Sequence, residues 1–196
     1  LPATPALHTG TGSWTFEAWL RPTRSSAAET IIEWGSNQGM EIWRSSNRVF
    51  AQRNHLGTTI DSSSATLPAN TWTHLAVTYD KPSGQLKFYT GGTLRQTVNS
   101  GTADWVTPSV PIYLGGYPGT AYSYQGGMDE VCLYSSALSA ADIAAIFQAG
   151  TAGKCIPDPE NAAPIANAGA DASIRLPVTE IALNGGAVDD GLPRNS

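Results

Sequence analysis

Residues 126–134, GGMDEVCLY, have the composition of a β-strand, and residues 135–150, SSALSAADIAAIFQAG, have the pattern of one short helix. Ser139 is a suitable N-cap with Asp142 three places on, and Gly150 suits the C-terminal end. An apolar stripe at about helical spacing is formed by Leu138, Ile143, Ile146 and Phe147. We therefore expect one helix that packs this stripe against a sheet.

The rest of the first 150 residues alternates apolar and polar side chains with the period of a β-strand. The clearest cases are WTFEAWLRP (14–22), TWTHLAVTYD (71–80) and GQLKFYTGG (84–92). Turn signals rich in Gly, Ser, Asn and Pro separate them from shorter candidate strands. Those shorter strands are expected at 30–34, 39–44, 48–53, 57–62, 93–98, 111–115 and 127–134. This pattern predicts an all-β, two-sheet antiparallel jelly-roll sandwich with one short C-terminal helix.

The amino-acid composition argues against nucleic-acid binding and against a membrane-spanning helix. Only 14% of the residues are charged and the net charge is −5, so no basic stripe exists to neutralise phosphates of nucleic acid. No apolar run approaches the roughly 20 residues that a membrane-spanning helix needs.

The charge is unevenly distributed along the chain. Residues 1–155 hold 9 Lys and Arg against 10 Asp and Glu, whereas residues 156–196 hold 2 Lys and Arg against 6 Asp and Glu. This change of charge indicates a boundary near residue 155.

The two cysteines flank the expected helix, with Cys132 on the preceding strand and Cys155 just beyond the helix. A disulfide between them would pin the helix to the sheet and stabilise the fold by roughly 3 kcal/mol in the chain-entropy model. Two unpaired thiols are the alternative, and a cytosolic origin would favour them. Two cysteines alone cannot form a tetrahedral zinc site.

A second unit is expected after the boundary. The segment IPDPENAA (156–163) is rich in proline and polar residues, as linkers are. Residues 164–196 follow, with two expected strands at about 172–176 and 179–184.

Several motifs together resemble a known family. These are GTGSWTFEAWLRP (10–22), NTWTHLAVTYDKPSGQLKFYTGGTLRQT (70–97), IYLGG (112–116) and GGMDEVCLYSSALSAADIAAIFQAGTAGKC (126–155). Residues 1–155 resemble the laminin-G-like, concanavalin A-like lectin and glucanase domains of bacterial secreted proteins. Residues 161–193 look like the opening of a PKD-like, immunoglobulin-type module, which gives residues 164–196 as a truncated Ig-like β segment.

The resemblance implies an extracellular, multi-domain parent protein and binding rather than catalysis. Domains of this kind often carry a structural calcium ion, and Asp129 is the residue that the resemblance makes its ligand. Calcium takes six to eight oxygen ligands, so backbone carbonyls and water would complete the site. The alternative is that the Asp129 carboxylate caps a turn or pairs with an arginine.

Catalytic patterns are weak. Glycoside hydrolysis needs two carboxylates across a sugar, and the E-x-D-x-x-E pattern of related β-glucanases is absent from the sequence. Glu17 stands alone in its strand, Glu33 and Glu41 flank a turn, and Asp129 and Glu130 should point to opposite faces of an alternating strand. No Gly-x-Ser-x-Gly motif supports a nucleophilic serine. We therefore predict that the chain is not an enzyme.

Aromatic and polar side chains in the expected loops favour carbohydrate binding, because sugars stack on aromatic rings and hydrogen-bond to amides, acids and guanidinium groups. Tyrosines also cover sandwich edges, so an ordinary framework role is the alternative. Trp19 and Trp72 should point away from the core, onto an open sheet face or beneath the helix or a long loop. The predicted sugar-binding residues are Trp43, Arg44, Arg53, His55, Trp105, Tyr117, Tyr122 and Tyr124.

Together these observations predict a non-catalytic, lectin-like carbohydrate-binding module of a secreted protein, with a polysaccharide or glycan as partner. The alternative is a protein-adhesion or spacer module at a bacterial cell surface. The partial second module could also mediate self-association, because an incomplete sheet leaves hydrogen-bonding groups at its edge for another chain.

Overall fold

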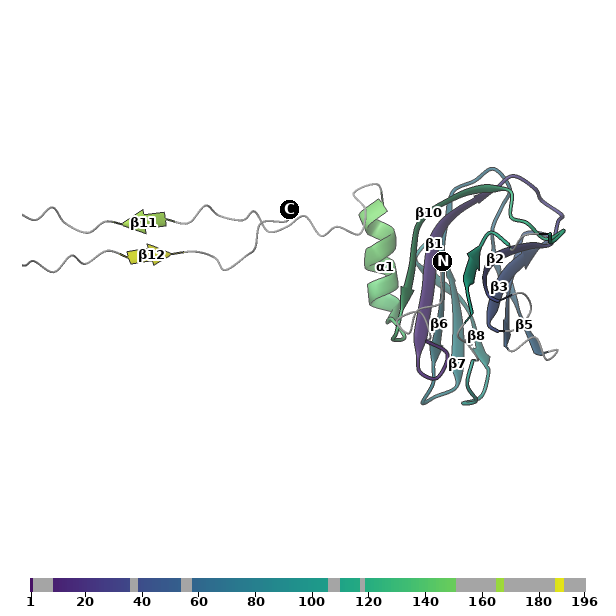
Figure 1. The fold of residues 1–196 in the computed structure, drawn as a ribbon, viewed down its shortest axis with the longest axis horizontal. Helices are drawn as coiled ribbons and strands as arrows, with labels where there is room; N and C mark the ends of the chain where they lie inside the picture. The colour runs from purple at the N-terminus through teal and green to yellow at the C-terminus, as the bar shows by residue number, and fades with distance from the viewer. Residues whose placement is uncertain are drawn as a thin grey trace, which may run out of the picture. The chain divides into compact units, whose positions relative to one another are not determined.

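The computed structural model describes residues 1, 9–35, 39–53, 58–105, 110–116, 119–150, 165–167 and 186–188. Within residues 1–150 the described chain forms two five-stranded antiparallel sheets that pack face to face, with one helix on the outside (Figure 1). The predicted all-β jelly-roll sandwich with a short C-terminal helix is therefore confirmed.

The first sheet, here named the helix-covered sheet, has the strand order β10-β1-β6-β7-β8. Its strands are β1 (Trp14–Pro22), β6 (Thr73–Asp80), β7 (Gln85–Thr90), β8 (Thr93–Asn99) and β10 (Gly126–Tyr134). The long alternating segments of the sequence thus become the neighbouring strands β1, β6 and β7.

The second sheet, here named the open sheet, has the strand order β5-β4-β3-β2-β9. Its strands are β2 (Glu29–Trp34), β3 (Glu41–Ser45), β4 (Arg48–Arg53), β5 (Thr58–Thr66) and β9 (Ile112–Leu114). In Figure 1 no described helix or strand of residues 1–150 lies over the outer face of this sheet.

The hydrophobic core lies between the two sheets. Trp14, Phe16, Ala18 and Leu20 of β1 are all fully buried there, as their alternation predicts. Trp105 also belongs to this core, where its ring packs edge-on against Trp14 at 5.2 Å between centroids. Burial of a side chain as large as Phe16 or Leu20 contributes about 1.5–3 kcal/mol, so the core holds the sheets together.

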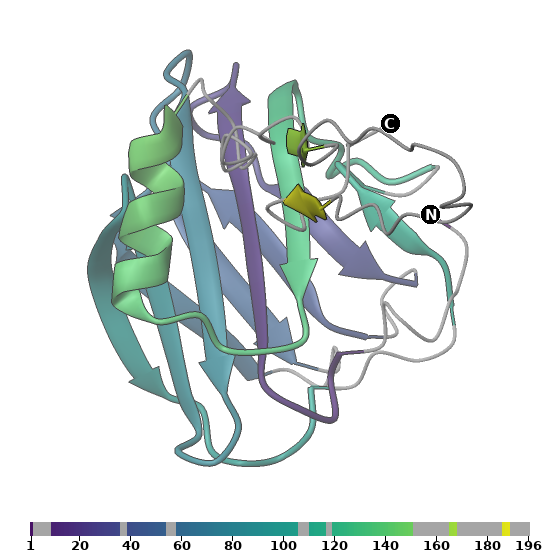
Figure 2. The same cartoon turned by 90° about the vertical axis from the view of Figure 1, so that its left-hand side faces the viewer.

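Helix α1 (Ala140–Ala149) packs on the outer face of the helix-covered sheet (Figure 2). The predicted capping box is present: the Ser139 hydroxyl accepts a hydrogen bond from the Asp142 amide, and the Asp142 carboxylate accepts one from the Ser139 amide. Ile143 is fully buried against Ala76 and Tyr89.

A polar network lies on the sheet face that the helix covers. The Glu17 carboxylate is bonded to His74 Nε2 at 2.9 Å and accepts the Tyr134 hydroxyl at 3.0 Å. Glu17 and His74 are both fully buried. At Glu17 and His74 the polar face of the sheet is therefore covered, and these two side chains do not lie on an open binding face.

The chain divides into two compact units, Leu1–Lys154 and Cys155–Ser196. In the second unit, β11 (Ile165–Asn167) and β12 (Gly186–Val188) pair in antiparallel fashion. The predicted linker 156–163 and the strands at 172–176 and 179–184 lie outside the described residues. The PKD-like character and the proposed domain bounds therefore stay predictions.

The disulfide also stays a prediction, because Cys155 lies outside the described residues; Cys132 is half-buried on β10. The described part of the chain has no helix with the length and apolar character needed to span a bilayer.

Candidate functional site

Two neighbouring rows of side chains cross the outer face of the open sheet, where Thr30 and Glu33 are buried and the other side chains are half-buried. In the first row Tyr113, Glu33, Glu41 and Gln52 are successive cross-strand partners on β9, β2, β3 and β4. In the second row Thr30, Trp43 and Phe50 are cross-strand partners on β2, β3 and β4. Together with Tyr122 these residues are named the acid–aromatic face.

Strand alternation explains why these side chains point outward. Ile42, Ala51 and Ile112 are immediate chain neighbours of residues in the first row, and all three lie in the hydrophobic core. Successive side chains of a strand point to opposite faces of the sheet. Glu41, Gln52 and Tyr113 therefore lie on the solvent side of the sheet.

Two carboxylates meet in the first row. Glu33 and Glu41 are directly opposite each other, and the Thr30 hydroxyl donates to Glu41 Oε1 at 3.0 Å. Burial, assisted by the negative charge of Glu33, raises the pKa of Glu41 from 4.5 to about 7, although the Thr30 hydrogen bond opposes the shift. Glu41 can therefore donate or accept a hydrogen bond near neutral pH.

Two aromatic rings stack in the second row. The centroids of Trp43 and Phe50 are 4.2 Å apart and the ring planes differ by 13°. The guanidinium carbon of Arg48 lies 5.2 Å from the Phe50 centroid. Within the described part of the chain, the buried Nε1 of Trp43 has no hydrogen-bond acceptor.

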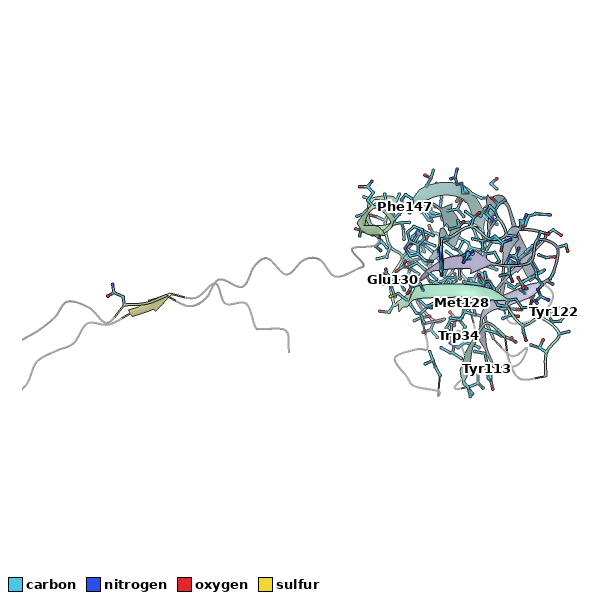
Figure 3. The ribbon with its side chains drawn as sticks, turned by 90° about the horizontal axis from the view of Figure 1, so that it is seen from above. Trp34, Tyr113, Tyr122, Met128, Glu130 and Phe147 are labelled. Carbon is cyan, nitrogen blue, oxygen red and sulfur yellow. The ribbon has the colours of Figure 1, made fainter. Side chains whose placement is uncertain are left out.

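The backbone of the loop that carries Tyr122 runs beside Thr30 of β2. The Thr30 amide donates to the Tyr122 carbonyl at 2.8 Å, and Thr30 forms a parallel bridge with Ser123. The Tyr122 side chain is 57% exposed. Figure 3 shows it on the opposite side of the sandwich from Phe147 of α1.

A partly buried ion network anchors this loop. The Glu29 carboxylate forms ion pairs with Arg44 and Arg24 and accepts the Gln125 amide at 3.0 Å. Arg24 also donates to the Ser123 carbonyl at 2.6 Å. The network therefore fixes the position of the loop relative to β2 and β3.

Two of the predicted sugar-binding residues cannot contact a sugar in this fold. Arg44 is fully buried and paired with Glu29, and Trp105 is fully buried in the core. The prediction is wrong for these two residues, because both side chains point inward. Arg44 instead positions the Tyr122 loop.

Of the other predicted sugar-binding residues, some lie on the acid–aromatic face and others make contacts within the fold. Trp43 and Tyr122 lie on the acid–aromatic face. Arg53 donates to Ser100 and lies 5.2 Å from the Trp105 ring. Tyr124 is half-buried and donates to the Gly127 carbonyl at 3.2 Å, and burial raises its pKa to about 12. His55 and Tyr117 lie outside the described residues.

Sequence reasoning missed Phe50, Gln52 and Tyr113, and it missed that Glu33 and Glu41 are partners. The signal was present in part: each residue occupies an outward position of an alternating strand. Their proximity depends on the strand register, which the alternation within one strand does not specify.

The predicted calcium site, with Asp129 as its one carboxylate ligand, is not tested by the described residues. No group of three or more His, Cys, Asp or Glu side chains gathers there in a way that could hold a metal ion. Asp129 is exposed, and its Oδ1 accepts the Glu130 amide at 2.8 Å. Calcium at Asp129 therefore stays a prediction that needs ligands from elsewhere.

Comparison with known proteins identifies the family. Residues 1–144 match the Laminin_G_3 family of the concanavalin A-like lectin/glucanases superfamily. The chain belongs to this family. No curated protein matches it.

Solved structures share the fold of this Laminin_G_3 chain at low sequence identity. A candidate carbohydrate-binding protein of Bacteroides ovatus is 21% identical with a TM-score of 0.59, over 72% of this chain and 42% of its own. The sialidase CBM40 of Ruminococcus gnavus, solved with α2,3-sialyllactose, is 20% identical with a TM-score of 0.57, over 71% and 84%. The SAP-like pentraxin of Limulus polyphemus is 14% identical with a TM-score of 0.54, over 69% of each chain.

Proposed function

We propose that this chain is a non-catalytic carbohydrate-binding module of a secreted, multi-domain protein, and that the acid–aromatic face binds the glycan. The observation that carries the proposal is the placement of the stacked Trp43 and Phe50 rings one row from Glu41 and Gln52. Aromatic rings offer a surface for the apolar face of a sugar, and the acid and amide groups can bond its hydroxyls.

Structural neighbours support the same class of ligand. The Ruminococcus gnavus domain was solved with a sialylated lactose, and a botulinum neurotoxin type C structure concerns two ganglioside molecules. Both share this fold, so a glycan is the first partner to test. An extracellular location accords with this proposal, as does the predicted disulfide.

The carboxylate pair does not lead us to propose hydrolysis. Glycosidases place their two carboxyl groups across the scissile bond, with the sugar between them. Glu33 is only 1% exposed and stands directly beside Glu41 on the neighbouring strand. Only Glu41 of the pair is exposed enough to hydrogen-bond a bound sugar.

The test is binding of the full chain to a glycan panel that includes sialyllactose, followed by titration of the best ligand. We expect Trp43→Ala to weaken binding at least tenfold, which corresponds to about 1.4 kcal/mol. Tyr122→Ala should weaken binding without lowering the melting temperature appreciably, because its side chain is exposed.

Trp72→Ala is the matched control, since Trp72 is also a partly exposed tryptophan but belongs to the helix-covered sheet. It should leave glycan affinity unchanged. Equal affinity of Trp43→Ala and the unmodified chain would refute the proposed site. If no glycan on the panel binds and the chain instead captures a specific protein, the adhesion alternative would be favoured.

A further inference from the structure

A pocket of about 390 Å³ lies on the helix-covered sheet, on the opposite face of the sandwich from the acid–aromatic face. Its lining residues are Trp19, Trp72, Asp129, Glu130 and Gly150. We name it the indole pocket. Figure 3 shows Glu130 near Phe147 of α1 and away from Tyr122. The volume lies within the range of roughly 300–1,000 Å³ that small ligands occupy.

The two indole rings are held by specific packing. Trp72 is 45% exposed, yet its ring crosses β1 to reach Gly127 of β10, where an added Cβ would lie 2.6 Å from Cη2 of the ring. Trp19 stacks on Phe147 of α1 with centroids 5.6 Å apart. Glycine at position 127 therefore allows Trp72 to lie close against the sheet.

A bulge in β10 brings two carboxylates to the same pocket. The β1–β10 register shifts between Glu17 and Trp19, and Glu130 has a φ of 49°, in the left-handed region that non-glycine residues seldom adopt. Asp129 and Glu130 therefore both line the pocket, and the expectation that they point to opposite faces is wrong.

The charges that the described lining residues bring to the pocket are negative. Gly150 ends α1, and the C-terminal end of a helix carries a partial negative charge. The last turn of α1 contains no basic residue to neutralise it. Arg21 lies on the same sheet face, but its Nε donates to the Asn70 carbonyl and the residue does not line the pocket.

We propose that the indole pocket binds an organic ammonium group. The faces of Trp19 and Trp72 attract a cation through their ring quadrupoles, and the carboxylates of Asp129 and Glu130 complement its charge. A bare calcium ion fits less well, since the described residues supply no cluster of three acidic or imidazole ligands. The ammonium group could belong to a lysine side chain or to a quaternary amine.

The test titrates the full chain with tetramethylammonium and with n-butylammonium, and follows the indole N–H signals of the tryptophans by NMR. We expect saturable shifts of the Trp19 and Trp72 signals. The variants Trp19→Phe and Trp72→Phe assign each signal to its residue. Tighter binding of n-butylammonium would identify a lysine side chain as the ligand, and tighter binding of tetramethylammonium would identify a quaternary amine. The neutral isostere 3,3-dimethyl-1-butanol should give no saturable shift.

Two variants separate charge from shape. Asp129→Asn should weaken ammonium binding at least tenfold, whereas Gly127→Ala should weaken it by displacing Trp72 and leave both carboxylates in place. Trp43→Ala should have no effect, so failure of the glycan proposal would not affect this result.

Three outcomes would overturn the proposal: neither cation produces a saturable shift, the neutral isostere binds as tightly as the cations, or calcium alone shifts these signals. Melting temperatures of the variants are measured alongside, so that loss of fold is separated from loss of binding.

Discussion

Glu41 is a half-buried acid whose protonation couples the acid–aromatic face to folding. Its pKa in the folded chain is about 7, above the ordinary value of 4.5, so the folded state holds the proton more tightly than the unfolded state. The contribution of this group to stability is therefore fully present below about pH 4.5, and it is lost as the pH rises through about 7.

We predict that the melting temperature falls between pH 5 and pH 8, and that Glu41→Gln removes most of this dependence. Glu33→Gln should move the fall to lower pH, because the neighbouring negative charge helps to raise the Glu41 pKa. Thermal unfolding at four pH values checks both variants. Parallel pH curves for the unmodified chain and Glu41→Gln would contradict the assignment.

Arg44 was expected on the sugar-binding surface and instead pairs with Glu29 inside the fold. Both side chains are fully buried, so removal of one leaves the other charge unpaired in a medium of low dielectric constant. We predict that Arg44→Ala lowers the free energy of unfolding by roughly 3–5 kcal/mol, measured by urea denaturation.

The control for Arg44 is Lys81→Ala. Lys81 pairs with Asp104 at the surface, where both side chains remain partly exposed. Exposed ion pairs contribute about 0–1 kcal/mol, so this variant should unfold at nearly the same urea concentration as the unmodified chain. Equal losses in the two variants would refute the anchoring role of Arg44.

At the scale of elements, sequence periodicity predicted the strands and the helix well. The alternation of Trp14, Phe16, Ala18 and Leu20 identified the buried side of β1, because the period of a strand is set by local geometry. The capping box at Ser139 is equally local.

What periodicity could not predict is which strands lie side by side. Glu33 and Glu41 became partners through the β2–β3 register, and Asp129 and Glu130 came to line the same pocket through the β10 bulge. Both features depend on pairing between segments, which a single strand does not encode.

The attachment of α1 to its sheet depends on Gly92. A Cβ at this position would lie 2.8 Å from the Phe147 ring, and the residue has a φ of 69°. Gly101 has the same φ, but no atom lies within 4 Å of its added Cβ. The two glycines therefore share backbone strain and differ in the contact with the helix.

We predict that Gly92→Ala destabilises the chain more than Gly101→Ala, because the methyl group displaces Phe147 from its stack with Trp19. Urea denaturation measures the difference, and the near-ultraviolet circular dichroism of the tryptophans should change only in Gly92→Ala. Equal destabilisation would mean that strain alone accounts for the cost.

At the scale of the whole molecule, the sandwich offers two chemically different outer faces. α1 covers the buried Glu17–His74 pair on one sheet and borders the indole pocket there. The open sheet presents the acid–aromatic face. Because the rigid core separates the two faces, ligands of two classes could occupy them at the same time.

The first unit should fold without the second. The hydrophobic core cluster between the sheets is formed entirely by residues of Leu1–Lys154, and the two units are compact separately. We predict that a chain of residues 1–155 unfolds cooperatively and melts within about 3 °C of the full chain, since about 1 kcal/mol shifts the melting temperature by 2–4 °C at this size. Keeping Cys155 leaves the predicted disulfide available to both proteins, so differential scanning calorimetry under matched redox conditions compares only the loss of residues 156–196. A broad transition or a much lower melting temperature for the shorter chain would mean that the second unit contributes to the stability of the sandwich.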